Sequence, residues 1–298
     1  MLMLRTALVA VLMGALLSGC GIRIVKYEFT DDHTVAEKYT SVRVRTGFGK
    51  VSIRYVPGLS ETKIHRTVQH AKDNKPSGVS YRIEGSTLVL DDCGDHCSIS
   101  YEVQVPSADI TVESPDSGSG DTVIEGVAAV DYKVGSGRFE AYDIAGNVQI
   151  DNGSGDITVR DIRGDVKSHG GSGRFEASRV KGSVTADMGS GDIELDQVQG
   201  KMLVKTGAGR ITGRTLDNDV TADASSGDVD LTFVSARTAR VTTGSGDITL
   251  RVPAAGGPYK VTGGSRTRDR KIDVPTDPSA KYELKLDAGS GDVRVTAV

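Results

Sequence analysis

A glycine-rich signal recurs along most of the chain at a nearly constant interval, and this regularity constrains the fold more than any other feature. Its commonest form is Gly-Ser-Gly, and from Gly118 the copies follow one another after 17, 18, 18, 18, 18, 18 and 19 residues. A unit this short cannot bury an apolar face alone, so neighbouring units must stack to build a continuous core. The copies begin at Gly118, Gly135, Gly153, Gly171, Gly189, Gly207, Ser225 and Gly244, and one more follows at Gly289.

Between these signals the residues alternate between apolar and polar. Val148 and Ile150 precede one turn, and Ile157 and Val159 follow it. This period of two is typical of half-buried strands. We therefore predict an all-β fold, a single-chain parallel β-solenoid with coils of about 18 residues, each advancing about 4.8 Å along the axis. Parallel crossovers of this kind predict a right-handed solenoid.

The residue that follows each glycine signal is usually charged. Stacked coils place these residues in one column, where opposite charges attract and like charges repel, so we interpret the column as a charge ladder that fixes the register. A second alternating column precedes the turns at Lys133, Asp151, His169, Asp187, Lys205 and Asp223. The charge ladder consists of Asp121, Arg138, Asp156, Arg174, Asp192, Arg210, Asp228 and Asp247.

The first residues predict export and anchoring. Arg5 precedes an apolar run that is too short to span a bilayer, and the run ends in Leu17-Ser18-Gly19-Cys20. This tetrapeptide resembles the lipobox of bacterial lipoproteins, which implies cleavage before Cys20 and its lipidation. Gly21 follows, and in Gram-negative lipoproteins the lack of Asp at this place resembles an outer-membrane address.

These features divide the chain into four parts. We expect a lipoprotein signal peptide at 1–19, the lipidated cysteine and a tether at 20–40, and irregular β-rich coils or a cap at 41–115. The repeat solenoid follows at 116–298, with a loop near 253–281.

Cys93 and Cys97 lie close together in the lead-in. In an exported chain, such a pair predicts a small disulfide loop. The alternative is a metal site that uses both cysteines with His96 and one of the flanking aspartates, although structural zinc sites more often space their ligands as C-x2-C.

The sequence offers no catalytic constellation, and we expect neither an enzyme nor a cofactor. Asp156 and Asp192 lie between arginines, which favours their ionised form and makes them poor general acids. We expect no metal site in the repeat either, since alternate arginines repel calcium. Asp228 and Asp247 follow two successive turns with no arginine between them in the charge ladder. They could bind a cation together, or the charge alternation could simply be less regular near the end of the ladder.

Composition argues against nucleic acid as a partner. The formal net charge is −4, aromatic residues make up 5% of the chain, and there is no tryptophan. Binding to nucleic acid needs a basic face and, for single strands, aromatic platforms.

The serial Ser-Gly-Asp-Ile/Val turns, together with the lead-in that ends in Val103-Gln104-Val105-Pro106, resemble the DUF4097 family, whose members are labelled putative adhesins. The resemblance covers roughly residues 41–298 and implies a β-solenoid. Some family members occur beside envelope-stress systems, and the family has no defined catalytic residue.

We accordingly predict a lipid-anchored, non-catalytic, adhesin-like binding or structural module of the cell envelope, located at the outer membrane. Its partners would be the membrane, through Cys20, and an envelope polymer or protein. The alternatives are a periplasmic scaffold associated with envelope stress and a polysaccharide-processing β-helix enzyme.

Overall fold

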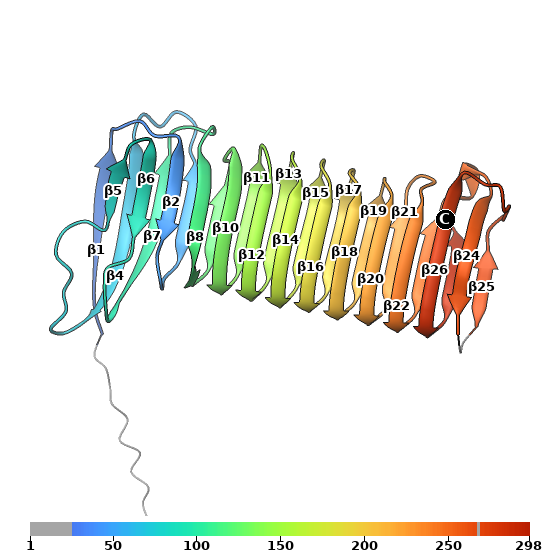
Figure 1. The fold of residues 1–298 in the computed structure, drawn as a ribbon. Coiled ribbons are helices and arrows are strands. Elements are labelled where there is room, and N and C mark those ends of the chain that lie inside the picture. The colour runs from blue at the N-terminus through green and yellow to red at the C-terminus, as the bar shows by residue number, and fades with distance from the viewer. Residues whose placement is uncertain (1–25, 267–268) are drawn as a thin grey trace, which may run out of the picture.

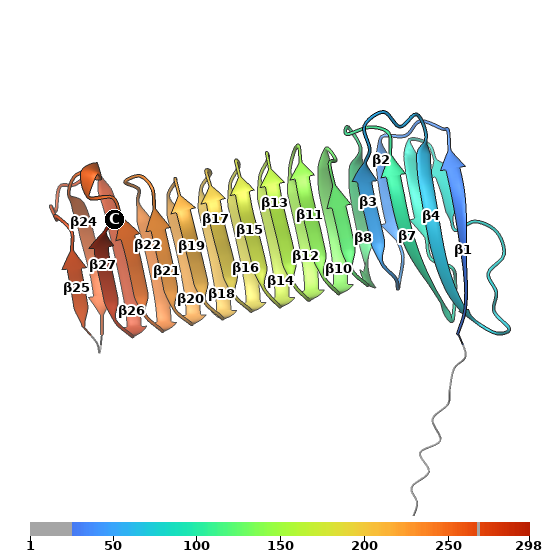
Figure 2. The ribbon, with the colours of Figure 1, turned by 180° about the vertical axis from the view of Figure 1, so that it is seen from behind.

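The computed structural model describes residues 26–266 and 269–298, and the chain there forms a long two-sheet rod (Figure 1). Each repeat contributes one strand to each sheet, so the prediction of a β-solenoid is confirmed. We call the 14-stranded sheet sheet A and the 13-stranded sheet sheet B. Figure 1 shows the rod from the side of sheet B, and Figure 2 shows it turned by 180°, from the side of sheet A.

The order of strands in sheet A shows the stacking directly. From β9 to β23, the even spacing of the repeat places each strand beside the strand one coil later. The strands are, in order, β1 (Lys26–Val35), β4 (Thr62–Ala71), β7 (Cys97–Val105), β3 (Val51–Tyr55), β9 (Thr122–Glu125), β11 (Phe139–Ile144), β13 (Ile157–Ile162), β15 (Phe175–Val180), β17 (Ile193–Val198), β19 (Ile211–Leu216), β21 (Val229–Phe233), β23 (Ile248–Val252), β27 (Val293–Ala297) and β25 (Arg270–Asp273).

Sheet B supplies the other half of each coil. From the C-terminal end of the rod, its strands are β24 (Tyr259–Ser265), β26 (Tyr282–Ser290), β22 (Ala239–Ser245), β20 (Val220–Ser226), β18 (Met202–Ala208), β16 (Val184–Ser190), β14 (Val166–Ser172), β12 (Val148–Ser154), β10 (Ala129–Ser136), β8 (Thr111–Ser119), β2 (Ser41–Arg45), β6 (Thr87–Asp91) and β5 (Tyr81–Glu84).

The core lies between the two sheets and is built from matching positions of successive coils. Ile157 pairs with Phe175 in the next coil, and Phe175 pairs with Ile193, and all three are fully buried. The register therefore follows the repeat. The second charged column is also confirmed, because Asp151 pairs with His169 and His169 pairs with Asp187.

The glycine signal has a steric cause. A Cβ added to Gly155 would lie 2.1 Å from the carbonyl oxygen of Gly137 in the preceding coil, and Gly173 stands in the same relation to Gly155, at 2.2 Å. Gly155 also has a φ of +130°, a backbone conformation that residues with a side chain rarely adopt. Backbones of neighbouring coils can approach this closely only where the residue of the later coil lacks a side chain.

At the N-terminal end the coils give way to antiparallel strands. β1 pairs with β4, and β4 pairs with β7, so residues 26–35 lie in sheet A, where the sequence analysis expects a tether. Arg66 on β4 is buried, and its Nε donates to Asp31 of β1 at 2.7 Å. The buried guanidinium and the strand pairing hold this segment against the sheet, and only the folded chain brings these two residues together.

The C-terminal end also contains strands where the sequence predicts a loop. The described residues between 253 and 281 include a short 3-10 turn, Ala254–Gly256, and the edge strands β24 and β25. β24 pairs with β26 and β25 pairs with β27, so both strands extend the sheets beyond the last repeat coil. Among the described residues, no helix is long and apolar enough to cross a membrane.

Candidate functional site

The predicted site residues fall in separate parts of the chain. Cys20 and the proposed signal peptide lie outside the described residues, so the structure makes no statement about them. The cysteine pair lies in the N-terminal end of the rod, and the charge ladder runs along one edge of the solenoid.

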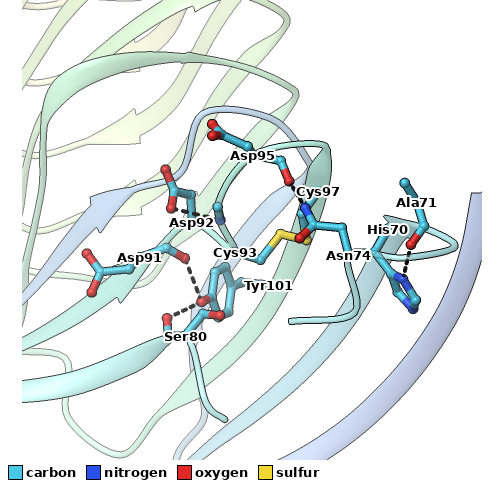
Figure 3. Close-up of a disulfide and its surroundings, with 11 residues drawn as sticks. His70, Ala71, Asn74, Ser80, Asp91, Asp92, Cys93, Asp95, Cys97 and Tyr101 are labelled. Carbon is cyan, nitrogen blue, oxygen red and sulfur yellow. Dashed lines mark hydrogen bonds between the residues drawn. A yellow bond between two sulfur atoms is a disulfide. The ribbon is translucent and has the colours of Figure 1, made fainter. Parts of the chain in front are cut away.

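Cys93 and Cys97 are joined by a disulfide, with their Cα atoms 5.7 Å apart (Figure 3). The loop is also held by hydrogen bonds: the side chain of Asn74 donates to the carbonyl oxygen of Asp95, and the Gly94 amide donates to Asp92 Oδ1 at 3.2 Å. Because both sulfur atoms are in the disulfide, neither is available as a thiolate ligand for the alternative zinc site.

The aspartates of the charge ladder bind backbone amides of the following coil. Asp156 Oδ1 accepts a hydrogen bond from the Arg174 amide at 2.9 Å, and Asp192 Oδ1 accepts one from the Arg210 amide at 2.8 Å. The same bond links Asp121 to the Arg138 amide at 3.0 Å. Each carboxylate thus satisfies a donor at the turn where the regular strand pairing is interrupted.

Direct ion pairing along the charge ladder is limited to one step among the described residues. Arg210 contacts Asp228 at 3.0 Å. Arg138 and Arg174 turn instead toward glutamates on sheet A, 4.0 Å from Glu140 and 3.5 Å from Glu194. The register is therefore supported chiefly by carboxylate-to-amide bonds, and the prediction that alternating charges attract along the column holds only at Arg210.

The two successive acidic turns follow the same pattern. Asp228 accepts from the Asp247 amide at 3.0 Å, and Asp247 accepts from the Asp292 amide at 2.8 Å. The bond from the Asp247 amide, helped by Arg210, lowers the pKa of Asp228 although burial opposes it. Among the described residues, no three histidine, cysteine, aspartate or glutamate side chains gather as a metal cluster.

A different column carries the most unusual backbone of the molecule. Near the end of five successive sheet A strands, β11 to β19, one non-glycine residue adopts a left-handed conformation. A conformation of this kind costs energy in every coil, and it concentrates at functional sites and at tight bends. The residues are Asp143 (φ 52°), Asp161 (60°), Arg179 (52°), Gln197 (54°) and Thr215 (54°).

These five residues line one surface hollow, which we call the bulge groove. It has a volume of about 770 Å³ and runs across successive coils. The buried side chains of Ile162 and Val198 belong to its lining. Val234, which is 53% exposed, also belongs to the lining. β21, the strand of that coil, is one residue shorter than β19, and the strand register shifts between Gly213 and Leu216.

The polar groups of the bulge groove are partly paired. Arg179 forms two hydrogen bonds of 2.6 Å to the Asp161 carboxylate, which lowers the pKa of Asp161. The pKa of Asp217 is also lowered, by hydrogen bonds from Ser235 and from Arg237. Lys181 forms no ion pair with any described residue. The groove therefore offers both charged and amide side chains on a fixed backbone.

The sequence contains a signal for the bulge groove, which is a three-residue step between buried positions in a strand that otherwise alternates every two residues. In the coil that starts at Ile157, the buried residues are Ile157, Val159 and Ile162, so the last step is three residues rather than two. A step of three within an alternating strand indicates an inserted bulge residue. The same step recurs in the following coils at Ala177 and Val180.

Comparison with known families agrees with this architecture. The family model described as Toastrack DUF4097 matches residues 98–296, two thirds of the chain. The chain belongs to the Toastrack DUF4097 family. The resemblance expected from the serial Ser-Gly-Asp turns is thereby confirmed, and the Toastrack match begins in β7, just after the disulfide loop.

Solved structures from several bacteria are similar to this chain, among them two putative adhesins and a putative lipid binding protein. A putative adhesin from Parabacteroides merdae is 14% identical with a TM-score of 0.38, and covers 91% of this chain and 96% of its own. A putative adhesin from Bacteroides fragilis is 14% identical with a TM-score of 0.38, at 93% and 100% coverage. A putative lipid binding protein from Parabacteroides distasonis is 12% identical with a TM-score of 0.41, at 91% and 96% coverage. No curated protein sequence matches the chain.

Proposed function

We propose that this Toastrack protein is a non-catalytic binding module of the cell envelope, anchored through lipidated Cys20, and that its partner lies in the bulge groove. The lipobox-like sequence before Cys20 supports the anchor. The rod supports presentation of a binding surface, because a stack of coils in one register gives a rigid scaffold.

One observation carries the proposal. Five successive coils hold a non-glycine residue in a left-handed conformation, and all five line the same groove. A strand without the extra residue would avoid this cost, as β21 does at the end of the groove. The lining of the groove takes side chains from each of these coils in turn, along a line parallel to the solenoid axis, which suits an extended partner.

The chemistry of the groove favours binding over catalysis. No histidine or cysteine lies among the described residues that line it. The lowered pKa of Asp161 and of Asp217 keeps both carboxylates ionised near neutral pH, whereas a glycan-cleaving acid needs a raised pKa. Turnover of an envelope glycan that is lost when Asp161 is replaced would favour the alternative of a polysaccharide-processing enzyme.

Site-specific photocrosslinking in living cells tests the groove. A benzoylphenylalanine introduced at Gln197 in the groove is expected to give a crosslinked product. The same group at Lys167, an exposed residue on the outer face of sheet B, is the matched control. A discrete band would indicate a protein partner, and material retained with isolated sacculi would indicate a polymer. Equal products from both positions, or none from Gln197, would overturn the proposed site.

Anchoring and orientation need their own experiment. Metabolic labelling with a palmitate analogue is expected to mark the natural chain and to fail in C20S. Protease shaving of intact cells, with an epitope after Val298 and a periplasmic protein as control, separates the two binding roles. Loss of the epitope would favour an adhesin-like surface module, and protection would favour the periplasmic scaffold.

A further inference from the structure

Ser178 lies at a second hollow, on the outer face of sheet A beside the bulge groove. It alternates with the core residues Phe175 and Ala177 on β15 and therefore points outward, yet it is only 8% exposed. Its neighbours across the strands are Arg160 in the preceding coil and Asp196 in the following coil. A small residue between two long ones leaves a hollow of about 330 Å³ over β15 and its neighbours.

The hydroxyl of Ser178 has no hydrogen-bond partner in the described structure. Most buried polar groups in proteins are paired, so an unpaired hydroxyl that also lines a surface hollow is a candidate for contact with a ligand.

Several charged groups around Ser178 lie outside close ion pairs. Arg179 is held by Asp161, and Glu194 lies 3.5 Å from Arg174. By contrast, Glu176, Asp196 and Arg214 form no ion pair within 4.0 Å with any residue that the structure describes, although Asp196 still interacts at longer range with Arg179. The hollow thus presents two carboxylates and a guanidinium without a close ionic partner, and the unpaired Ser178 hydroxyl, within a few strand spacings of about 4.8 Å.

The balance of charges restricts the ligand. The lining contains three arginines, at 160, 179 and 214, and three acids, at 176, 194 and 196. A strongly charged ligand gains little from such a surface. A ligand with neighbouring hydroxyls fits it well, since each hydroxyl can donate to a carboxylate and accept from a guanidinium or from Ser178.

We propose that the Ser178 hollow binds a sugar unit of a neutral glycan. This inference rests on the proposed binding function and names the class of polymer that the module takes. A zwitterionic peptide could also pair with both the acidic and the basic side chains. Unlike the adjacent hydroxyls of a sugar, however, it does not carry closely spaced groups that each donate and accept hydrogen bonds.

The test uses chitotetraose and maltotetraose as neutral probes, with saturation-transfer NMR and titration calorimetry on the chain from residue 21 onward. At least one probe is expected to bind, and S178A and D196N are expected to weaken it at least tenfold. S178A removes only an unpaired hydroxyl, so its thermal midpoint should not fall. S168A is the matched control, because Ser168 is also buried and unpaired but faces the core, and it should leave binding unchanged.

The outcomes separate this inference from the proposed function. A groove-specific crosslink from Gln197 together with no binding of either tetrasaccharide would overturn the glycan site and leave the binding module standing. Binding that S178A and D196N do not change would also overturn it. Binding of a Gly-Lys-Asp-Ser peptide, lost in S178A, in place of the sugars would identify the peptide alternative and reject the glycan.

Discussion

Asp192 accepts a hydrogen bond of 2.8 Å from the backbone amide of Arg210, 18 residues later in the chain. The two residues occupy the same place in neighbouring coils, so the bond joins one coil to the next rather than a charge to a charge. The Arg210 guanidinium lies 3.0 Å from Asp228, on the other side. Arg210 thus holds the turn through its backbone amide, while its side chain pairs with Asp228.

Replacing Asp192 distinguishes the carboxylate-to-amide bond from charge attraction. D192N keeps an oxygen acceptor and is expected to be close to neutral, whereas D192A should lower the free energy of unfolding by about 1 kcal/mol. Thermal and urea unfolding followed by circular dichroism measure both. Equal destabilisation by D192N and D192A would show that charge, rather than hydrogen bonding, supports the turn.

Acid should weaken the solenoid through its bonded carboxylates. The pKa values of Asp161, Asp217 and Asp228 lie below their ordinary value in the folded chain. Each group therefore stabilises the fold above its unfolded pKa of about 3.9, and this contribution is lost as the pH falls through the lower folded value. The thermal midpoint should change little between pH 7 and about 5 and should fall steeply below about 4.

The triple variant D161N/D217N/D228N provides the control for the acid effect. Because amides do not titrate, its midpoint should depend less on pH below about 4 than that of the natural chain. The same steep fall in both proteins would assign acid sensitivity to other groups.

Gly155 tests the close approach of coils at the glycine turns. G155A brings a Cβ to within 2.1 Å of the Gly137 carbonyl oxygen at a positive φ, and we expect a loss of roughly 2–4 kcal/mol. G257A is the matched control, since Gly257 has a φ of +92° but nothing within 4 Å of an added Cβ. That variant should lose only the cost of the backbone conformation, roughly 1–3 kcal/mol, and therefore less than G155A. Similar losses in the two variants would mean that backbone conformation alone explains the glycines.

Thr215 tests the strain in the bulge groove. It is a β-branched residue with a φ of 54°, so T215G should stabilise the fold by about 1 kcal/mol. T212G, in the extended part of the same strand, should destabilise it by roughly 0.5–1 kcal/mol. The free energy of unfolding measures both changes. A loss of stability in T215G would show that the Thr215 side chain outweighs the strain, contrary to the interpretation of the groove as a strained site.

The sequence by itself determined the solenoid, its coil length and its register. These follow from local features that recur in every coil: the alternation of Ile157 and Val159, the glycine turn, and the polar residue after it. Because each coil contacts chiefly its neighbours, a pattern of about 18 residues specifies the whole stack. The step from Val159 to Ile162 marked the bulge in the same local way.

The tertiary structure decided what depends on residues that are far apart in sequence or on more than one coil. Asp31 and Arg66 meet only because β1 and β4 pair, and this pairing places residues 26–35 in the sheet. Arg174 contacts Glu194 on a strand of the next coil, which no single column of charges reveals. The hollow at Ser178 exists because Arg160 and Asp196 flank it from two other strands. The local repeat determines the path of the backbone. The contacts of the side chains depend on residues of other coils, which come within reach only in the folded stack.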